Sequence, residues 1–186
     1  MSDEKARRLA DLGTGIVEEL KARGYEPWLW PRCENVAGWE GTAPIIFSAL
    51  NPSKGGGENR FPTRADRMLF WCLSENGFAD AHLTDVLKAK ATNDDAPSFL
   101  RNNSFMEVHR AWLLEEVAIV RPRLIVAVGQ RAHDFLRRWL SDDERLRCIP
   151  HYAWAVRFPK RAGTRFADAM VDLRRQVGVA AGGERA

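Results

Sequence analysis

Asn51 and His151 are polar residues that follow short predicted strands, and their side chains could act on one ligand. Asn51 directly follows the apolar run Pro44–Leu50, and His151 follows Pro150 and the short strand candidate Leu146–Ile149. An amide can hold a water molecule with its oxygen and donate with its nitrogen, whereas an imidazole can donate to a developing negative charge. The pair therefore indicates a site that positions water and stabilises an anion.

The segment after Asn51 supplies a stiff turn and one aromatic ring. Pro52 has no backbone donor and a fixed φ, so it stiffens the turn that continues into Ser53. Phe61 is a lone aromatic residue at the end of a glycine-rich loop, where it could stack on a flat ligand. Simpler interpretations stay open: the Asn-Pro pair only begins a turn, and Phe61 only anchors its loop.

The segment after His151 combines aromatic rings with positive charge, and no acidic residue lies between His151 and Arg165. Its aromatic and basic residues are Tyr152, Trp154, Arg157, Lys160, Arg161 and Arg165. Rings interleaved with cations are suited to stacking on bases and to binding phosphates. The alternative is a solvated loop from Pro150 to Gly163 in which the histidine bonds only to nearby backbone.

Charge and composition limit the class of protein. The chain has 186 residues, of which 45% are hydrophobic and 28% are charged, as in an ordinary globular protein. We expect a single domain over residues 1–178, with a first helix at about 3–23, and a flexible tail at 179–186. The net charge is only +3, but positive charge gathers between residues 145 and 175, which favours a nucleic-acid partner.

The sequence shows no sign of a membrane span, a disulfide framework or a clustered metal site. No apolar run approaches the length of a membrane span, and the charged N-terminus lacks a secretory signal. The three cysteines Cys33, Cys72 and Cys148 lie far apart and form no CxxC pair. We expect a cytoplasmic monomer with no cofactor and no membrane partner.

Strands and helices alternate along the chain. Buried strands are predicted at 44–50, 82–87, 123–128 and 146–149, and helices at 63–76, 104–117, 130–140 and from 164. Capping boxes are predicted at Thr63 with Asp66 and at Ser104 with Glu107. Residues 89–103 are expected to form a polar loop. The tryptophans Trp71, Trp112 and Trp139 are expected in the core.

This alternation predicts an α/β fold with three layers, in which helices cover both faces of a central, mainly parallel, four-stranded sheet. Ligands of such sheets bind beyond the carboxyl ends of the strands. The loops after Asn51, at Gly129 and after His151 should therefore meet at one edge. Gly129 opens a helix and could help to bind an anion there, or could simply form a strand-to-helix turn.

Several motifs together resemble the uracil-DNA glycosylase superfamily, in the mismatch-specific uracil/thymine branch. Residues 49–53, Ala-Leu-Asn-Pro-Ser, resemble its Gly-x-Asn-Pro-Gly motif, and Phe61-Pro62 falls where the family has a base-stacking phenylalanine. Residues 83–88, Leu-Thr-Asp-Val-Leu-Lys, are similar to its Thr-Asp-Leu-Val-Lys segment. Residues 121–132 resemble its Lys-Pro, strand, Gly-x-x-Ala segment, and Pro150-His151 stands where many members have His-Pro-Ser.

The resemblance implies a DNA glycosylase that flips a uracil or another deaminated or mismatched base out of DNA and hydrolyses its N-glycosidic bond without a cofactor. It implies Asn51 and His151 as catalytic residues. Substrate-binding residues would be Pro52, Ser53, Phe61, Asp85, Gly129 and Tyr152. DNA-binding residues would be Trp154, Arg157, Lys160, Arg161 and Arg165. Alternatives are a non-catalytic nucleic-acid-binding homologue and an enzyme acting on a free nucleoside or nucleotide.

Overall fold

A four-stranded parallel sheet forms the centre of the protein, as the sequence predicts. The computed structural model describes residues 2–51, 62–91, 96–141, 143–158 and 164–178. Its strands are β1 (Ile45–Ala49), β2 (His82–Asp85), β3 (Leu124–Val128) and β4 (Leu146–Ile149), in the order β2-β1-β3-β4. All neighbours pair in parallel, with Ala49 beside Asp85 and Val128 beside Ile149. All four strands therefore end at the same edge.

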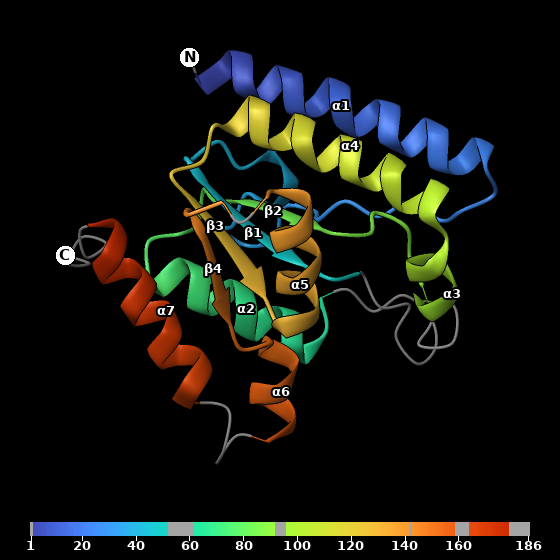
Figure 1. The fold of residues 1–186 in the computed structure, drawn as a ribbon. Helices are drawn as coiled ribbons and strands as arrows, with labels where there is room; N and C mark the ends of the chain where they lie inside the picture. Colours follow the sequence, from blue (N-terminus) through green and yellow to red (C-terminus); the bar gives the residue numbers. More distant parts are fainter. Residues whose placement is uncertain (1, 52–61, 92–95, 142, 159–163, 179–186) are drawn as a thin grey trace.

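Helices cover both faces of the sheet, which gives the predicted three-layer α/β/α architecture (Figure 1). On one side lie α1 (Ser2–Ala22), α4 (Asn103–Val120) and α5 (Gln130–Trp139), with the short α3 (Ala96–Arg101) against α4. On the other lie α2 (Arg64–Glu75), α6 (Tyr152–Arg157) and α7 (Thr164–Val177). A 3₁₀ turn, η1 (Gly38–Glu40), precedes β1.

The alternation of side chains along each strand builds a core on each face. Phe47 and Val126 pack with Phe70 and Phe166 from the α2 and α7 side, whereas Ile125 packs with residues of α1, α4 and α5. Both sets are apolar because helices cover both faces of the central strands. This explains why β1 and β3 are nearly continuous apolar runs in the sequence, whereas the edge strands β2 and β4 contain polar residues.

Helix caps explain where two of the helices begin. The Thr63 side chain accepts from the Asp66 N–H, and the Asp66 carboxylate accepts from the Thr63 N–H, which confirms the predicted capping box of α2. The box predicted for Ser104 with Glu107 is wrong. Asn102 caps α4 instead, because its side chain accepts from the Phe105 N–H at 3.1 Å.

Two predicted loops contain helices, and one predicted core residue is exposed. Helix α3 lies within the expected polar loop 89–103, and α6 lies within the expected loop 150–163. Both helices have six residues, too few to produce a periodic apolar pattern. Trp71 is 59% exposed because its neighbours Phe70 and Cys72 form the inner face of α2. Trp112 is buried, as predicted, and Trp139 packs partly buried against the core.

Candidate active site

Four residues of the predicted site lie where the parallel strands end. Asp85 is the last residue of β2, Gly129 directly follows β3, and Asn51 and His151 each come two residues after β1 and β4. Strand β3 lies between β1 and β4, so Asn51 and His151 follow strands on either side of β3. The four residues therefore lie at the edge where ligands of parallel sheets bind.

The backbone and its neighbours hold the His151 ring in one orientation. The residue caps α6, and its Nδ1 accepts a hydrogen bond from the Ala153 N–H at 3.1 Å. The Tyr152 ring stacks on the imidazole, with ring centres 4.6 Å apart and planes 21° apart. An Nδ1 that accepts carries no hydrogen, so the neutral ring carries its hydrogen on Nε2. His151 therefore offers an Nε2–H donor.

Burial also keeps His151 neutral. It lowers the pKa of the imidazole from its ordinary value, and the carboxylate of Asp66 opposes the shift only in part. The ring is half-buried rather than fully enclosed. A neutral imidazole with its hydrogen on Nε2 can donate a hydrogen bond to a developing anion.

Gly129 forms a turn in which the backbone passes close to the His151 side chain. Its φ is +97°, in the region that favours glycine, and a Cβ there would lie 3.2 Å from the His151 Cβ. Its own N–H donates to the Ile149 carbonyl at 2.8 Å, so this group is already used. The geometry favours the strand-to-helix turn over an anion-binding role for this N–H.

Asp66 connects α2 to α6 at the same edge. Its Oδ1 accepts from the Tyr152 hydroxyl at 3.3 Å, while its Oδ2 accepts from Thr63 within the capping box. Burial, and next the nearby Asp66 charge, raise the pKa of the Tyr152 phenol well above its ordinary value. Asp66 acts on the pKa values of His151 and Asp85 too, so these groups share one electrostatic neighbourhood.

Asp85 is a carboxyl group buried without full hydrogen bonding. Only 2% of the residue is exposed, and neither side-chain oxygen accepts a hydrogen bond of good geometry from the described part of the chain. Burial raises its pKa to about 7, opposed by the charge of Lys88 and by the indole of Trp30. A buried acceptor left open at the end of a strand is costly unless a ligand satisfies it.

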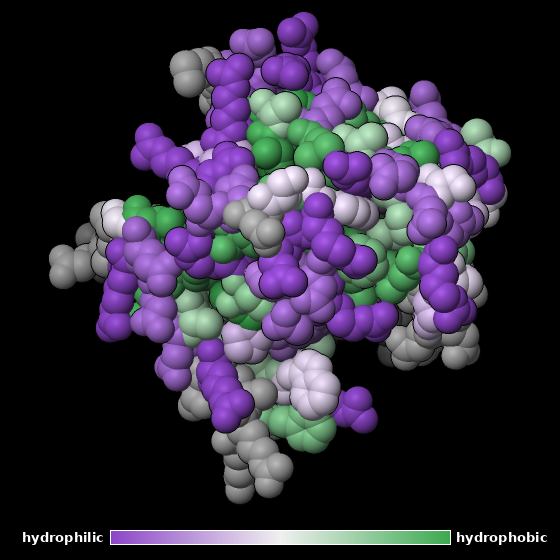
Figure 2. All heavy atoms as spheres, in the orientation of Figure 1, coloured by the Kyte–Doolittle hydropathy of each residue, from purple (hydrophilic) through white to green (hydrophobic). Residues whose placement is uncertain are grey.

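Helix α6 presents an aromatic and basic surface. Trp154 and Phe158 are 61% and 41% exposed, and their rings lie 5.2 Å apart at 31°. The Arg157 guanidinium lies 5.7 Å from the centre of the Phe158 ring. Figure 2 shows pale and green side chains exposed at the lower end of the molecule, where Figure 1 places α6. Arg165 is exposed near the start of α7.

Five predicted site residues, Pro52, Ser53, Phe61, Lys160 and Arg161, lie outside the described residues, as does the predicted tail 179–186. The described part of the glycine-rich segment begins again at Pro62. Asn51 is described and is half-buried at the end of the β1 segment. The topology therefore brings Asn51, Asp85, Gly129, His151 and Tyr152 to one edge of the sheet.

Sequence reasoning missed a group of buried polar residues behind this edge. His82, Lys88, His109 and Glu116 are all at most 1% exposed. A signal was present, because His109 and Glu116 follow Phe105 and Trp112 on one face of α4, where apolar residues are expected. Charged residues on such a face are fully buried only when they are paired.

Within the described residues, no group of His, Cys, Asp and Glu side chains could hold a metal ion. The three cysteines are free thiols, and Cys148 is exposed. None of the helices in this part of the chain has the length and apolar character that crossing a membrane requires.

The protein has an α/β fold in which polar residues lie at the carboxyl ends of parallel strands, the edge where such folds bind ligands. The family model of the Uracil DNA glycosylase superfamily matches residues 38–174, and the chain belongs to this family. No curated protein matches the chain. The matched range includes the whole sheet, the four strand-end residues and α6. Membership suggests DNA glycosylase activity and implies DNA binding in general terms.

Proposed function

We propose that this protein is a DNA glycosylase that removes uracil, or another deaminated or mismatched base, by hydrolysis of the N-glycosidic bond. The observation that carries the proposal is the His151 ring, which is held with a neutral Nε2–H at the edge where the strands end. We take the target to be a base flipped out of DNA, because its glycosidic bond is inaccessible inside a duplex.

In this proposal His151 stabilises the departing base. Cleavage leaves negative charge on the base oxygens and positive character on the sugar. The Nε2–H donates to the oxygen on which negative charge develops, while Tyr152 and the Ala153 N–H hold the ring still. A donor that is already oriented needs little reorganisation in the transition state, which is the main source of such stabilisation.

Asn51 positions the attacking water in this proposal. It follows β1, which is separated from the strand of His151 by β3, so a base and its sugar would lie between the two residues. An amide is a poor base, but a cation-like sugar needs an oriented water more than a deprotonated one. Pro52 and Ser53 would shape the floor of the pocket, and Phe61 would stack on the base.

Asp85 reads the edge of the base in this proposal. Because its pKa is raised to about 7, the neutral acid is well populated near neutral pH. A protonated carboxyl group has a donor beside an acceptor and can form two hydrogen bonds with the imide edge of uracil, in which a carbonyl adjoins an N–H. Its open hydrogen-bonding capacity supports this role.

Helix α6 contacts the DNA in this proposal. Trp154, with Phe158 beside it, can stack on a base or wedge into the duplex, and such stacking contributes roughly 1–3 kcal/mol per base. The cations Arg157, Lys160, Arg161 and Arg165 would bind phosphates. The cost of flipping a nucleotide, a few kcal/mol, is offset by these contacts.

We also propose that α1 belongs to this domain, which then spans residues 1–178. Helix α1 lies before the matched range but packs on α4, and its Leu9, Ile16 and Leu20 are fully buried. Removing α1 would expose this apolar surface of α4. A monomer would suffice for the proposed site, because its residues come from one chain.

Incubation with oligonucleotides that contain uracil, a thymine mismatch, hypoxanthine or xanthine tests the activity. Each oligonucleotide is tested as a single strand and as a duplex. Abasic sites, detected by cleavage with alkali, should form on at least one of these substrates. The Asn51→Ala/His151→Ala double variant is the matched control for contaminating glycosylase. Binding to all of these oligonucleotides without excision of any base would instead support a non-catalytic nucleic-acid-binding protein.

A further inference from the structure

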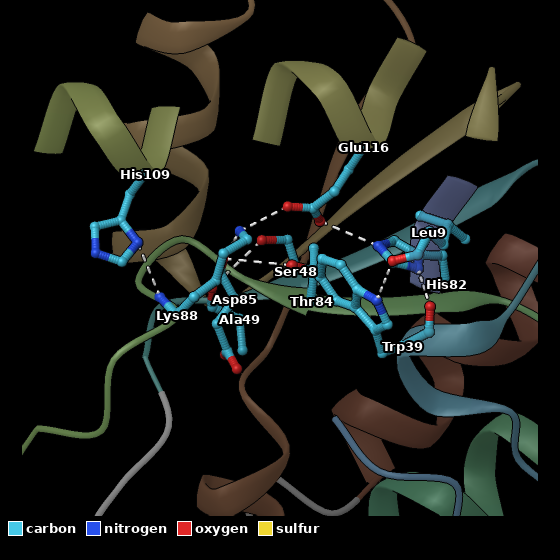
Figure 3. Close-up of polar contacts among 10 residues, drawn as sticks. All are labelled: Leu9, Trp39, Ser48, Ala49, His82, Thr84, Asp85, Lys88, His109 and Glu116. Atoms are coloured by element: carbon cyan, nitrogen blue, oxygen red, sulfur yellow. Dashed lines mark hydrogen bonds and ion pairs between the residues drawn. The ribbon is translucent and has the colours of Figure 1, made fainter. Parts of the chain in front are cut away.

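A chain of buried polar contacts runs behind β2 toward the proposed site (Figure 3). His82, at the start of β2, lies with Nδ1 2.7 Å from the Trp39 carbonyl and Nε2 3.1 Å from Glu116 Oε2. Charged partners hold the pKa of Glu116 below its ordinary value although burial opposes them, so the group is a carboxylate. Both ring nitrogens of His82 therefore lie within hydrogen-bonding distance of an oxygen atom.

Lys88 continues this chain to Asp85. Its Nζ lies 2.8 Å from Glu116 Oε1 and donates to the backbone carbonyl of Asp85 at 2.8 Å. Its backbone N–H donates to His109 Nδ1 at 3.1 Å. Burial, and next the Lys88 charge, lower the pKa of His109 to about 3, so this imidazole is neutral. Lys88 is therefore held at both ends and is 1% exposed.

The Lys88 charge lies next to Asp85. Lys88 pairs with Glu116 and also donates to the backbone carbonyl of Asp85, and its charge favours the ionised form of the Asp85 carboxyl. The other groups facing Asp85 are Asp66 from α2, the neutral Tyr152 phenol from α6 and the Trp30 indole.

We propose that Lys88 is a positioning residue for the site: it fixes the last residue of β2 through the carbonyl of Asp85 and supplies the positive charge against which the Asp85 carboxyl ionises. Glu116 sets how much of that charge acts on Asp85, because it neutralises Lys88 from the opposite side. His82 holds Glu116 in place and links the cluster to the backbone of η1.

The cluster thereby controls which base edge Asp85 can read, a consequence that rests on the proposed function of the site. The neutral acid pairs with an imide edge, in which N–H and C=O are adjacent. The carboxylate is acceptor-only and pairs with an edge that offers two adjacent N–H donors. The charge balance between Lys88 and Glu116 sets the pH at which one form replaces the other.

The ionisation of Asp85 can be measured directly, without DNA and without activity. The full chain is labelled with ¹³C at the aspartate side-chain carboxyl carbons, and the Asp85 signal, assigned by its loss in Asp85→Asn, is followed through a pH titration. Lys88→Met should raise the Asp85 midpoint by about one unit or more, because a nearby cation favours the charged form. Glu116→Gln should lower it, because a nearby anion disfavours that form.

The two substitutions are expected to shift the Asp85 midpoint in opposite directions. If Lys88 and Glu116 had only a structural role, both substitutions would disturb the site and shift the midpoint in the same direction. Lys88→Met leaves Glu116 without its cation and can fail to fold, so Glu116→Gln, which keeps the size and an acceptor oxygen, is the second test. An Asp85 midpoint that is unchanged or higher in folded Glu116→Gln overturns the proposal. Wild-type protein that excises no base would overturn the proposed function and leave this titration intact.

Discussion

The two halves of the carboxyl edge handle charge in opposite ways. On the β2 side, Asp85 is almost completely buried and is backed by the Lys88–Glu116 ion pair. On the β4 side, His151 is half-buried, neutral and held by a backbone N–H and a stacked ring. Buried charges fix position strongly because breaking a buried pair is costly, whereas a neutral ring can meet substrate and solvent.

This difference suggests a division of labour. The rigid β2 side is suited to reading a base, since small displacements there are resisted by ion pairs and backbone contacts. The half-buried β4 side is suited to the chemical step, since its donor must reach an atom whose charge changes during the reaction. Substitutions on the two sides should therefore have different effects on rate, specificity and pH dependence.

The largest effect is expected on the β4 side. His151→Ala should slow single-turnover excision by about 10²–10³-fold, the range for removal of one oxyanion donor. The side chain also caps α6, so the variant should bind DNA somewhat more weakly, and saturating enzyme removes this effect from the measured rate. Rapid quench with saturating enzyme measures the chemical step. A wild-type rate in this variant would remove His151 from the mechanism and with it the contrast between the two sides.

Asn51 tests the water-positioning role in the centre of the edge. Asn51→Ala should slow excision by about 10²-fold, within the range for a positioned group that assists water attack. Asn51→Asp should retain activity, because a carboxylate also orients water and favours a cationic sugar. Equal loss in both variants, measured at saturating enzyme with folding checked by circular dichroism, would indicate a structural role for the side chain.

Substitution of Asp85, on the β2 side, should change the pH dependence of excision. The raised pKa means that Asp85 is a neutral acid below about pH 7 and a carboxylate above it. Excision of uracil should therefore fall about tenfold per pH unit above the midpoint, because only the acid donates to the uracil carbonyl. Asp85→Asn keeps a donor and an acceptor at all pH values, so kcat/KM of this variant should be nearly independent of pH between about pH 6 and about pH 9.

The same substitution has a stability consequence of known sign. A folded-state pKa raised above the ordinary value means that the wild type loses stability as pH rises from about 4 to about 7. Asp85→Asn cannot ionise, so its melting temperature should be less sensitive to pH over this window. If the wild type and the variant lose stability in parallel, Asp85 does not titrate as described.

The smallest effect is expected at the surface and has a matched control. Trp154→Ala on α6 should weaken binding to DNA about tenfold, because a stacked base contributes roughly 1–3 kcal/mol. Trp71→Ala on α2 removes a tryptophan of similar exposure, 59% against 61%, and should leave DNA binding unchanged. Fluorescence anisotropy with a labelled duplex compares the two. Equal weakening would mean that α6 is not specifically the DNA-binding surface.

Much of the fold could be predicted from the sequence because its signals are local. Strands β1 and β3 are short apolar runs ended by a turn residue, and helices α1, α2 and α4 carry periodic apolar positions. Parallel order then follows from the alternation of strands and helices, so the meeting of Asn51 and His151 at one edge was predictable without coordinates.

Helix α6 could not be predicted from local sequence patterns. Six residues hold too little periodicity to predict a helix, and α6 forms because His151 caps it while Tyr152 and Ala155 are buried against α2 and α7. The orientation of the His151 ring, and hence its available N–H, depends on this helix. The sequence identified the residue, but the tertiary contacts decided which of its nitrogens can act.

The sequence by itself determined the α/β class, the strand ends and the identity of the polar residues placed there. Only the tertiary structure decided that Lys88 pairs with Glu116, 28 positions away on α4, and that both lie behind Asp85. The physical reason is that ionisation depends on burial and on neighbours from distant segments, which no local pattern specifies. Packing of α4 on the sheet removes Lys88 and Glu116 from water, and the burial of Asp85 itself raises the pKa of its carboxyl group.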